Sequence, residues 1–242
     1  MLASTTSTQD SGLLDVLVPA FERNHENVRV RVIAVGSGEA MALARRGDAD
    51  ILLVHSPADE AAFMRAGSGV RRLPVMRNDY VIAGPPDDPA GLRGESDAGA
   101  AFRRIASANA PFISRGDSSG THRKELELWH ESGSEHARRT EVGQGMGEAL
   151  TIASERGAYV LTDRGTYLAL SANLRLEPFV AGDARLANRY SVITVRGSRN
   201  AHYANTFADW LVSPGAADLI RTFGVARFGQ PLFFPAADSL RD

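Results

Sequence analysis

The sequence VRVRVIAVGSG at residues 28–38 is the best indicator of fold class, because a β-branched, initially alternating run leads into two glycines. Such a run is typical of a strand, and glycine after a strand marks a turn. Residues 39–46 have helical spacing, residues 50–55 form a continuous apolar run, and Pro57 suits the first turn of another helix. Strands that alternate with helices indicate a parallel sheet with helices on its faces.

Two similar segments, NDYVIA at residues 78–83 and NRYSVI at residues 188–193, enclose a block with strands and helices of its own. We expect helices near residues 13–24, 102–108, 120–132, 147–156, 201–211 and 215–223. The sequence therefore predicts an α/β chain of two lobes joined by two crossover strands. Lobe 1 would comprise residues 1–78 and 190–242, and lobe 2 residues 79–189. Each lobe would hold a mixed, mainly parallel sheet flanked by helices, and a ligand site is expected between two such lobes.

Composition excludes several classes of protein. The 242 residues carry a formal charge of −2, so no basic surplus is available to neutralise nucleic-acid phosphates. The absence of cysteine rules out disulfides and thiolate metal sites. No apolar run reaches the roughly 18 residues that a membrane span needs, and residues 1–5 lack the features of a signal peptide. The six histidines show no metal-ligand spacing, so we expect neither a metal site nor a cofactor.

The residues best suited to bind an anion are in FISRGDSSGTH at residues 112–122, where a predicted strand leads into a helix through a hydroxyl-rich turn. The first N–H groups of a helix lack intrahelical partners and favour negative charge. Ser119, Thr121 and Arg115 add hydroxyl donors and a permanent charge, which together form an anion cradle. Asp117 is expected to orient Arg115. If Asp117 instead faced the ligand, a protonated anion such as hydrogen phosphate would be favoured.

Two other segments, residues 4–11 and 36–38, share this hydroxyl and glycine chemistry. Each also has a simpler explanation, because Ser and Thr cap helices and glycine follows many strands. The glycine-rich residues 143–147 could contact the ligand or only pack. Arg164 is expected in a structural ion pair, and Trp129 and Trp210 are expected in the core.

The chain resembles the tungstate-binding proteins (TupA type) of bacterial ABC importers over nearly its whole length. The matching segments are TTSTQDSGLL (5–14), IAVGSG (33–38), GDADILLVH (47–55), NDYVI (78–82), SRGDSSGTH (114–122), GQGMG (143–147), LTDRGTY (161–167) and WLVSP (210–214). The sequence departs from the pattern at Ser37, where threonine is more usual, and at Ser118.

This resemblance implies a type II periplasmic-binding-protein fold that closes on a tetrahedral oxyanion and delivers it to a membrane permease. It implies a periplasmic or membrane-associated monomer that binds tungstate or molybdate and is not an enzyme. The implied ligands are Thr6, Ser7, Ser37, Arg115, Ser119, Gly120 and Thr121. Phosphate and sulfate remain alternatives within the same fold, because all these anions need similar donors.

One enzyme alternative remains. Residues 116–120 fit G-x-S-x-G, the turn that presents the nucleophile in α/β-hydrolases. A serine hydrolase would use Ser118, with Asp183 and His202 as the nearest acid and base in the required chain order.

Overall fold

The computed structural model describes residues 1–135 and 137–240, and the chain forms two compact units. Unit 1 consists of Met1–Asn78 and Arg189–Asp242, and unit 2 consists of Asp79–Asn188. The strands β4 (Gly69–Gly84) and β9 (Ala187–Val195) both run from one unit into the other. Within the described residues, no helix has the length and apolar character that crossing a bilayer requires.

Unit 1 contains a parallel sheet core with an antiparallel addition. Its strands are β1 (Leu2–Thr5), β2 (Val32–Val35), β3 (Ile51–Val54) and part of β9, in the order β2-β1-β3-β9, and β10 (Phe234–Pro235) pairs with β4. Its helices are α1 (Thr6–Asp10), α2 (Leu14–Arg23), α3 (Ser37–Arg46), α4 (Pro57–Arg65), α9 (Ala201–Leu211), α10 (Pro214–Thr222) and α11 (Val225–Phe228). β1 is parallel to β2 and β3, and β9 is antiparallel to β3.

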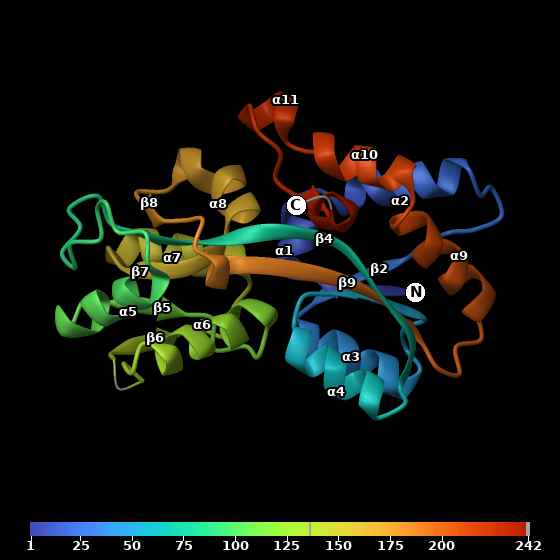
Figure 1. The fold of residues 1–242 in the computed structure, drawn as a ribbon, viewed down its shortest axis with the longest axis horizontal. Helices are drawn as coiled ribbons and strands as arrows, with labels where there is room; N and C mark the ends of the chain where they lie inside the picture. Colours follow the sequence, from blue (N-terminus) through green and yellow to red (C-terminus); the bar gives the residue numbers. More distant parts are fainter. Residues whose placement is uncertain (136, 241–242) are drawn as a thin grey trace. The chain divides into compact units, whose positions relative to one another are not determined.

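Helices cover both faces of this sheet. α3 and α4 lie on one face (Figure 1), where Met41 and Phe63 pack against Ala3 and Leu52. Because successive strand residues point to opposite faces, Leu2 and Ile51 face the other way, toward Phe207 of α9. Burial on both faces explains why β3 is apolar without interruption.

Unit 2 is built in the same way. Its strands are part of β4, β5 (Phe112–Ser114), β6 (Arg139–Glu141), β7 (Tyr159–Asp163) and β8 (Glu177–Val180), in the order β4-β7-β5-β6 with β8 also on β4. Its helices are α5 (Ala98–Ser107), α6 (Gly120–Glu131), α7 (Met146–Arg156) and α8 (Arg164–Leu170). β5 is parallel to β6 and β7, and β4 is antiparallel to β7.

Two separate apolar clusters lie on the two faces of this sheet. Phe102 of α5 and Trp129 of α6 pack on the face that carries Ile82, whereas Leu150 of α7 packs on the face that carries Val81. The alternation along β4 therefore assigns α5 and α6 to one layer and α7 and α8 to the other. The predicted α/β class with mainly parallel sheets is confirmed.

Local predictions differ from the structure at two strands. The sequence pattern does not predict β1, because residues 4–11 have the hydroxyl-rich character of a loop. The strand predicted over residues 28–35 is shorter, and β2 begins at Val32, opposite Leu2. Residues 28–31 precede the first paired residue, Val32, and pair with no strand among the described residues, so alternation alone does not make them a strand.

Candidate anion-binding site

The candidate residues of unit 1 lie at one edge of its sheet. β1 and β2 are parallel, and their last paired residues are Thr5 and Val35. Thr6 therefore begins α1 and Ser37 begins α3 just beyond the same end of these two paired strands. The predicted ligands Thr6, Ser7 and Ser37 thus lie at one end of this sheet, where helix starts offer backbone N–H donors.

A network of hydroxyl groups connects this edge. The hydroxyl of Thr5 lies 3.2 Å from that of Ser7 and 2.7 Å from that of Thr8. Ser7 Oγ is also 3.5 Å from Nε2 of His55, the residue that directly follows β3. The His55 ring packs against Tyr190 of β9, with centroids 4.7 Å apart. Thr5, Thr8 and His55 were not predicted as site residues, although each sits at or beside the carboxyl end of a parallel strand.

Ser37 is the most informative residue of this edge. Its side chain is fully buried (0 % exposed), and its hydroxyl has no hydrogen-bond partner within the residues the structure describes. A buried hydroxyl without a partner costs free energy. Such a group at the start of a helix, where backbone N–H groups are also free, is a donor available to a ligand.

The candidate residues of unit 2 lie in the loop between β5 and α6. Arg115 follows β5 directly, Ser119 is the N-cap of α6, and Gly120 and Thr121 form its first turn. All four are buried, and Arg115 is only 2 % exposed. The N-cap role of Ser119 is local chemistry, because its Oγ accepts the backbone N–H of His122 at 3.2 Å.

The guanidinium of Arg115 is held by two partners. Its Nε donates to the carbonyl of Gln144 at 2.7 Å, and its Nη2 donates to a carboxylate oxygen of Asp117. The other Asp117 oxygen accepts the backbone N–H of Ser119 at 3.1 Å. The prediction that Asp117 orients Arg115 is confirmed. The Gln144 contact connects the glycine-rich residues 143–147 to the loop through a main-chain carbonyl.

The net charge of the Arg115–Asp117 pair is close to zero. Burial raises the pKa of Asp117, but the Arg115 charge and the hydrogen bonds from Ser119 outweigh burial and hold that pKa below its ordinary value. Asp117 is therefore ionised at neutral pH and compensates Arg115. Binding of an anion here would depend on directed N–H and O–H donors more than on net positive charge.

The remaining structural predictions are mostly confirmed. Arg164 pairs with Asp79 at 3.5 Å, and Trp129 is buried in the core of unit 2. Trp210 is only partly buried, so its assignment to the core is wrong. Its indole packs beside Phe21 and Phe207 at the surface of unit 1, because α9 is an outer helix with one face exposed.

The residues of the hydrolase alternative have other partners. The carboxylate of Asp183 accepts the backbone N–H of Ala98 at 2.8 Å and is ion-paired with Arg185. His202 is an exposed residue of α9, with its ring against Tyr203. The amide of Ser118 is bonded to His122 and not to either of these residues. The candidate acid, Asp183, is thus already part of a structural ion pair with Arg185.

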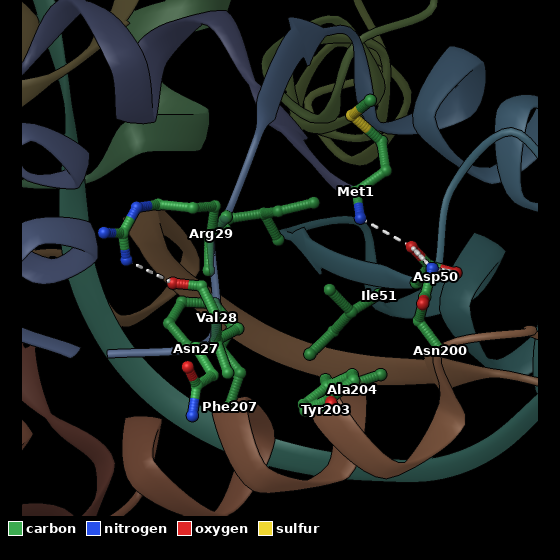
Figure 2. Close-up of a pocket in the computed structure, with 12 residues that line it drawn as sticks. Met1, Asn27, Val28, Arg29, Asp50, Ile51, Asn200, Tyr203, Ala204 and Phe207 are labelled. Carbon is green, nitrogen blue, oxygen red and sulfur yellow. Dashed lines mark hydrogen bonds and ion pairs between the residues drawn. The ribbon is translucent and has the colours of Figure 1, made fainter. Parts of the chain in front are cut away.

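A cavity of about 240 Å³ in unit 1 has a different character (Figure 2). The carboxylate of Asp50 in its wall binds the Met1 ammonium, Ser198 and Asn200. The Arg29 guanidinium donates to the carbonyl of Val28 at 2.9 Å. None of the predicted ligands lines this cavity, and its charged groups are already paired. Within the described part of the chain, no cluster of metal-ligating side chains occurs.

Comparison with known proteins places this arrangement in a family. The PBP superfamily domain matches residues 1–214. The tungstate-binding protein TupA of Peptoclostridium acidaminophilum is 44% identical over 245 residues, which cover 98% of this chain and 85% of that protein. A tungstate ABC transporter structure from Geobacter sulfurreducens has 44% identity and a TM-score of 0.83, and covers 90% of this chain and 96% of its own.

A second solved structure, the tungstate-binding protein TupA of Desulfovibrio alaskensis G20, has 42% identity and a TM-score of 0.81, with 97% of each chain covered. These relatives are named as binding proteins or transporter components, not as enzymes. The chain belongs to the PBP superfamily and, within it, to the family of the TupA proteins.

Proposed function

We propose that this chain is the solute-binding protein of an ABC importer for a tetrahedral oxyanion, with tungstate or molybdate as its ligand. Its ligands would be Thr6, Ser7, Ser37, Arg115, Ser119, Gly120 and Thr121. The chain would act outside the cytoplasmic membrane as a monomer and present the bound anion to a permease. Capture between two closing lobes, 1–78 with 190–242 and 79–189, would be its mechanism.

The observation that carries this proposal is the chemical uniformity of the donor set. Hydroxyls at the strand ends of unit 1 and the Arg115 loop of unit 2 both present donors at helix starts. A deprotonated tetrahedral dianion has only acceptor oxygens and needs such a host. Relatives that are 42–44% identical over almost the whole chain carry tungstate in their names.

The state of Asp117 favours a deprotonated anion. Both of its carboxylate oxygens already accept hydrogen bonds within the loop, from Arg115 and Ser119. Hydrogen phosphate carries a proton that needs an acceptor, whereas tungstate, molybdate and sulfate carry none at neutral pH. Sulfate therefore remains the main competitor, and cavity size must distinguish it from the larger tungstate.

Thermal unfolding with each anion tests the proposal. A ligand at ~100 times its dissociation constant adds about 2.7 kcal/mol of stability, which raises Tm by several degrees in a chain of this size. We expect this rise with micromolar tungstate or molybdate and a much smaller one with sulfate or phosphate. The absence of a shift with every oxyanion would overturn the proposal. Ester hydrolysis that Ser118→Ala abolishes would favour the hydrolase instead.

A further inference from the structure

The loop between β5 and α6 contains a serine in an unfavourable backbone conformation. Ser118 has φ 57°, in the left-handed region that non-glycine residues usually avoid. Gly116, two residues earlier, has φ 61°. Gly116 adopts such a value without steric cost, but Ser118 does not. Interactions elsewhere must hold Ser118 in this conformation.

His122 supplies that interaction. The backbone N–H of Ser118 donates to Nδ1 of His122 at 3.0 Å, and the backbone N–H of His122 donates to Ser119 Oγ at 3.2 Å. These two hydrogen bonds join the loop to the first turn of α6 from both directions. Ser119 in turn donates its backbone N–H to Asp117, the partner of Arg115.

The first of these bonds determines the protonation state of the imidazole. A backbone N–H can only donate, so Nδ1 of His122 must accept and cannot carry a proton. The ring is therefore neutral with its proton on Nε2, an atom shielded from solvent. Protonation of Nδ1 would place two donors 3.0 Å apart and break the bond.

The charged side chains around the His122 imidazole nearly cancel one another. Asp117 and Arg115 of the loop and Glu141 and Arg139 of β6 face it, two acidic and two basic groups. Burial is the largest influence, and it lowers the pKa of His122. His122 is thus neutral at pH 7, in agreement with its hydrogen bond.

We propose that His122 is a positioning residue for anion binding, whose neutral imidazole holds Ser118 in the left-handed conformation and so places Asp117, Arg115 and Ser119. This inference rests on the proposed function. Because protonation of His122 breaks the bond, oxyanion affinity is constant above neutral pH and falls as pH decreases through the lowered pKa of His122. The contact assigned to His122 is its hydrogen bond with the backbone of Ser118.

A measurement without ligand tests the contact first. The ring nitrogens of ¹⁵N-labelled protein at pH 7.5 should identify His122 as the Nε2–H tautomer. The Ser118 amide resonance should shift with the same pH midpoint as the His122 ring. A Nδ1–H tautomer, or an amide that does not follow the ring, would overturn the inference whether or not the protein binds an oxyanion.

Affinity for micromolar sodium tungstate between pH 5.5 and 8 provides the second test. His122→Phe should bind about tenfold more weakly at pH 7.5, because the acceptor is lost. His122→Asn should bind like the wild type at pH 7.5, since its Oδ1 can accept from Ser118, and should lose the acidic decline. His130→Asn, an exposed histidine on the same helix, is the matched control and should retain that decline.

The wild type and the variants are compared at equal pH, so the protonation of tungstate and of other protein groups affects them all alike. Wild-type affinity in His122→Phe at pH 7.5, or an unchanged acidic decline in His122→Asn, would contradict the positioning role. If the wild type binds no oxyanion, the proposed function fails and the tautomer measurement alone decides the role of His122.

Discussion

The candidate donors of unit 1 and unit 2 are organised in opposite ways. In unit 1, neutral hydroxyls gather where parallel strands end, and the hydroxyl of Ser37 has no partner within the described residues. In unit 2, the charged group of Arg115 is held by Gln144 and Asp117, and the loop backbone is tied to His122. Both sets begin helices, but the hydrogen bonds of unit 1 join neutral groups, whereas those of unit 2 hold a charged side chain.

The difference follows from the cost of burial. A buried guanidinium without partners is very unfavourable, so Arg115 must be compensated before any ligand arrives. A hydroxyl costs less and can rotate to suit an incoming oxygen. We infer that unit 2 provides a preorganised charged donor, whereas unit 1 provides adaptable neutral donors. Four substitutions test this contrast.

Arg115→Ala should have the largest effect. Charge-assisted hydrogen bonds contribute about 1.5–3 kcal/mol each, so the loss of two should weaken tungstate binding at least a hundredfold. Isothermal titration calorimetry measures this loss. Arg123→Ala, at an exposed arginine on the same helix, is the control and should bind normally. Equal affinities of the two variants would show that the charged donor is misplaced.

Glu125→Gln should change how stability depends on pH. Burial raises the pKa of Glu125 from 4.5 to about 7, although contacts with Ser114, the Arg115 N–H and Trp129 oppose the rise. Because the folded-state pKa is the higher one, the contribution of Glu125 to the free energy of unfolding is greatest below pH 4.5 and decreases as pH rises to about 7. The decrease is on the order of 3 kcal/mol.

Urea denaturation from pH 4.5 to 8 measures this dependence. Glu125→Gln is neutral at every pH and should flatten the profile, whereas Glu131→Gln, at an exposed site on the same helix, should not. A profile in Glu125→Gln as steep as that of the wild type would refute the assignment.

Gly116→Ala should distort the loop of unit 2. A Cβ at this position would lie 2.8 Å from Cβ of Glu141, and its φ is 61°. Gly133→Ala is the matched control, with φ 66° and no atom within 4 Å of the added Cβ. The left-handed conformation alone costs ~1–2 kcal/mol in both variants. Gly116→Ala should lose more stability than this and also bind tungstate more weakly.

Thermal unfolding measures the loss of stability in each variant, and titration with tungstate measures the loss of affinity. If both variants lose the same stability and bind equally well, the contact between the loop and β6 has no role in the site.

Ser37→Ala should have the smallest effect, and in opposite directions on stability and binding. Removal of a buried hydroxyl without a partner should leave stability unchanged or slightly increased, while the loss of one ligand hydrogen bond weakens tungstate binding by about 1 kcal/mol, roughly fivefold. Thr194→Val removes another buried hydroxyl that lacks a partner in the described structure, and should not change affinity. A stability loss in Ser37→Ala without weaker binding would make Ser37 purely structural.

Local sequence patterns predicted most of the secondary structure. The helix expected near residues 13–24 is α2 (Leu14–Arg23), and Pro57 begins α4 as expected. Such elements depend on periodicity and capping within a few residues. β1 is four residues long and acquires its identity from pairing with residues 32–35 and 51–53, which are distant in sequence. No local signal specifies that pairing.

The same division applies to the site. The sequence by itself determined the fold class, the types of donor and the orienting role of Asp117, because spacing places Asp117 two residues from Arg115 and the helix start close behind. Only the tertiary structure decided that Ser7 lies beside His55 and that His122 accepts the Ser118 N–H. Those contacts depend on strand register and on a left-handed backbone, which form only when the packed unit compensates their cost.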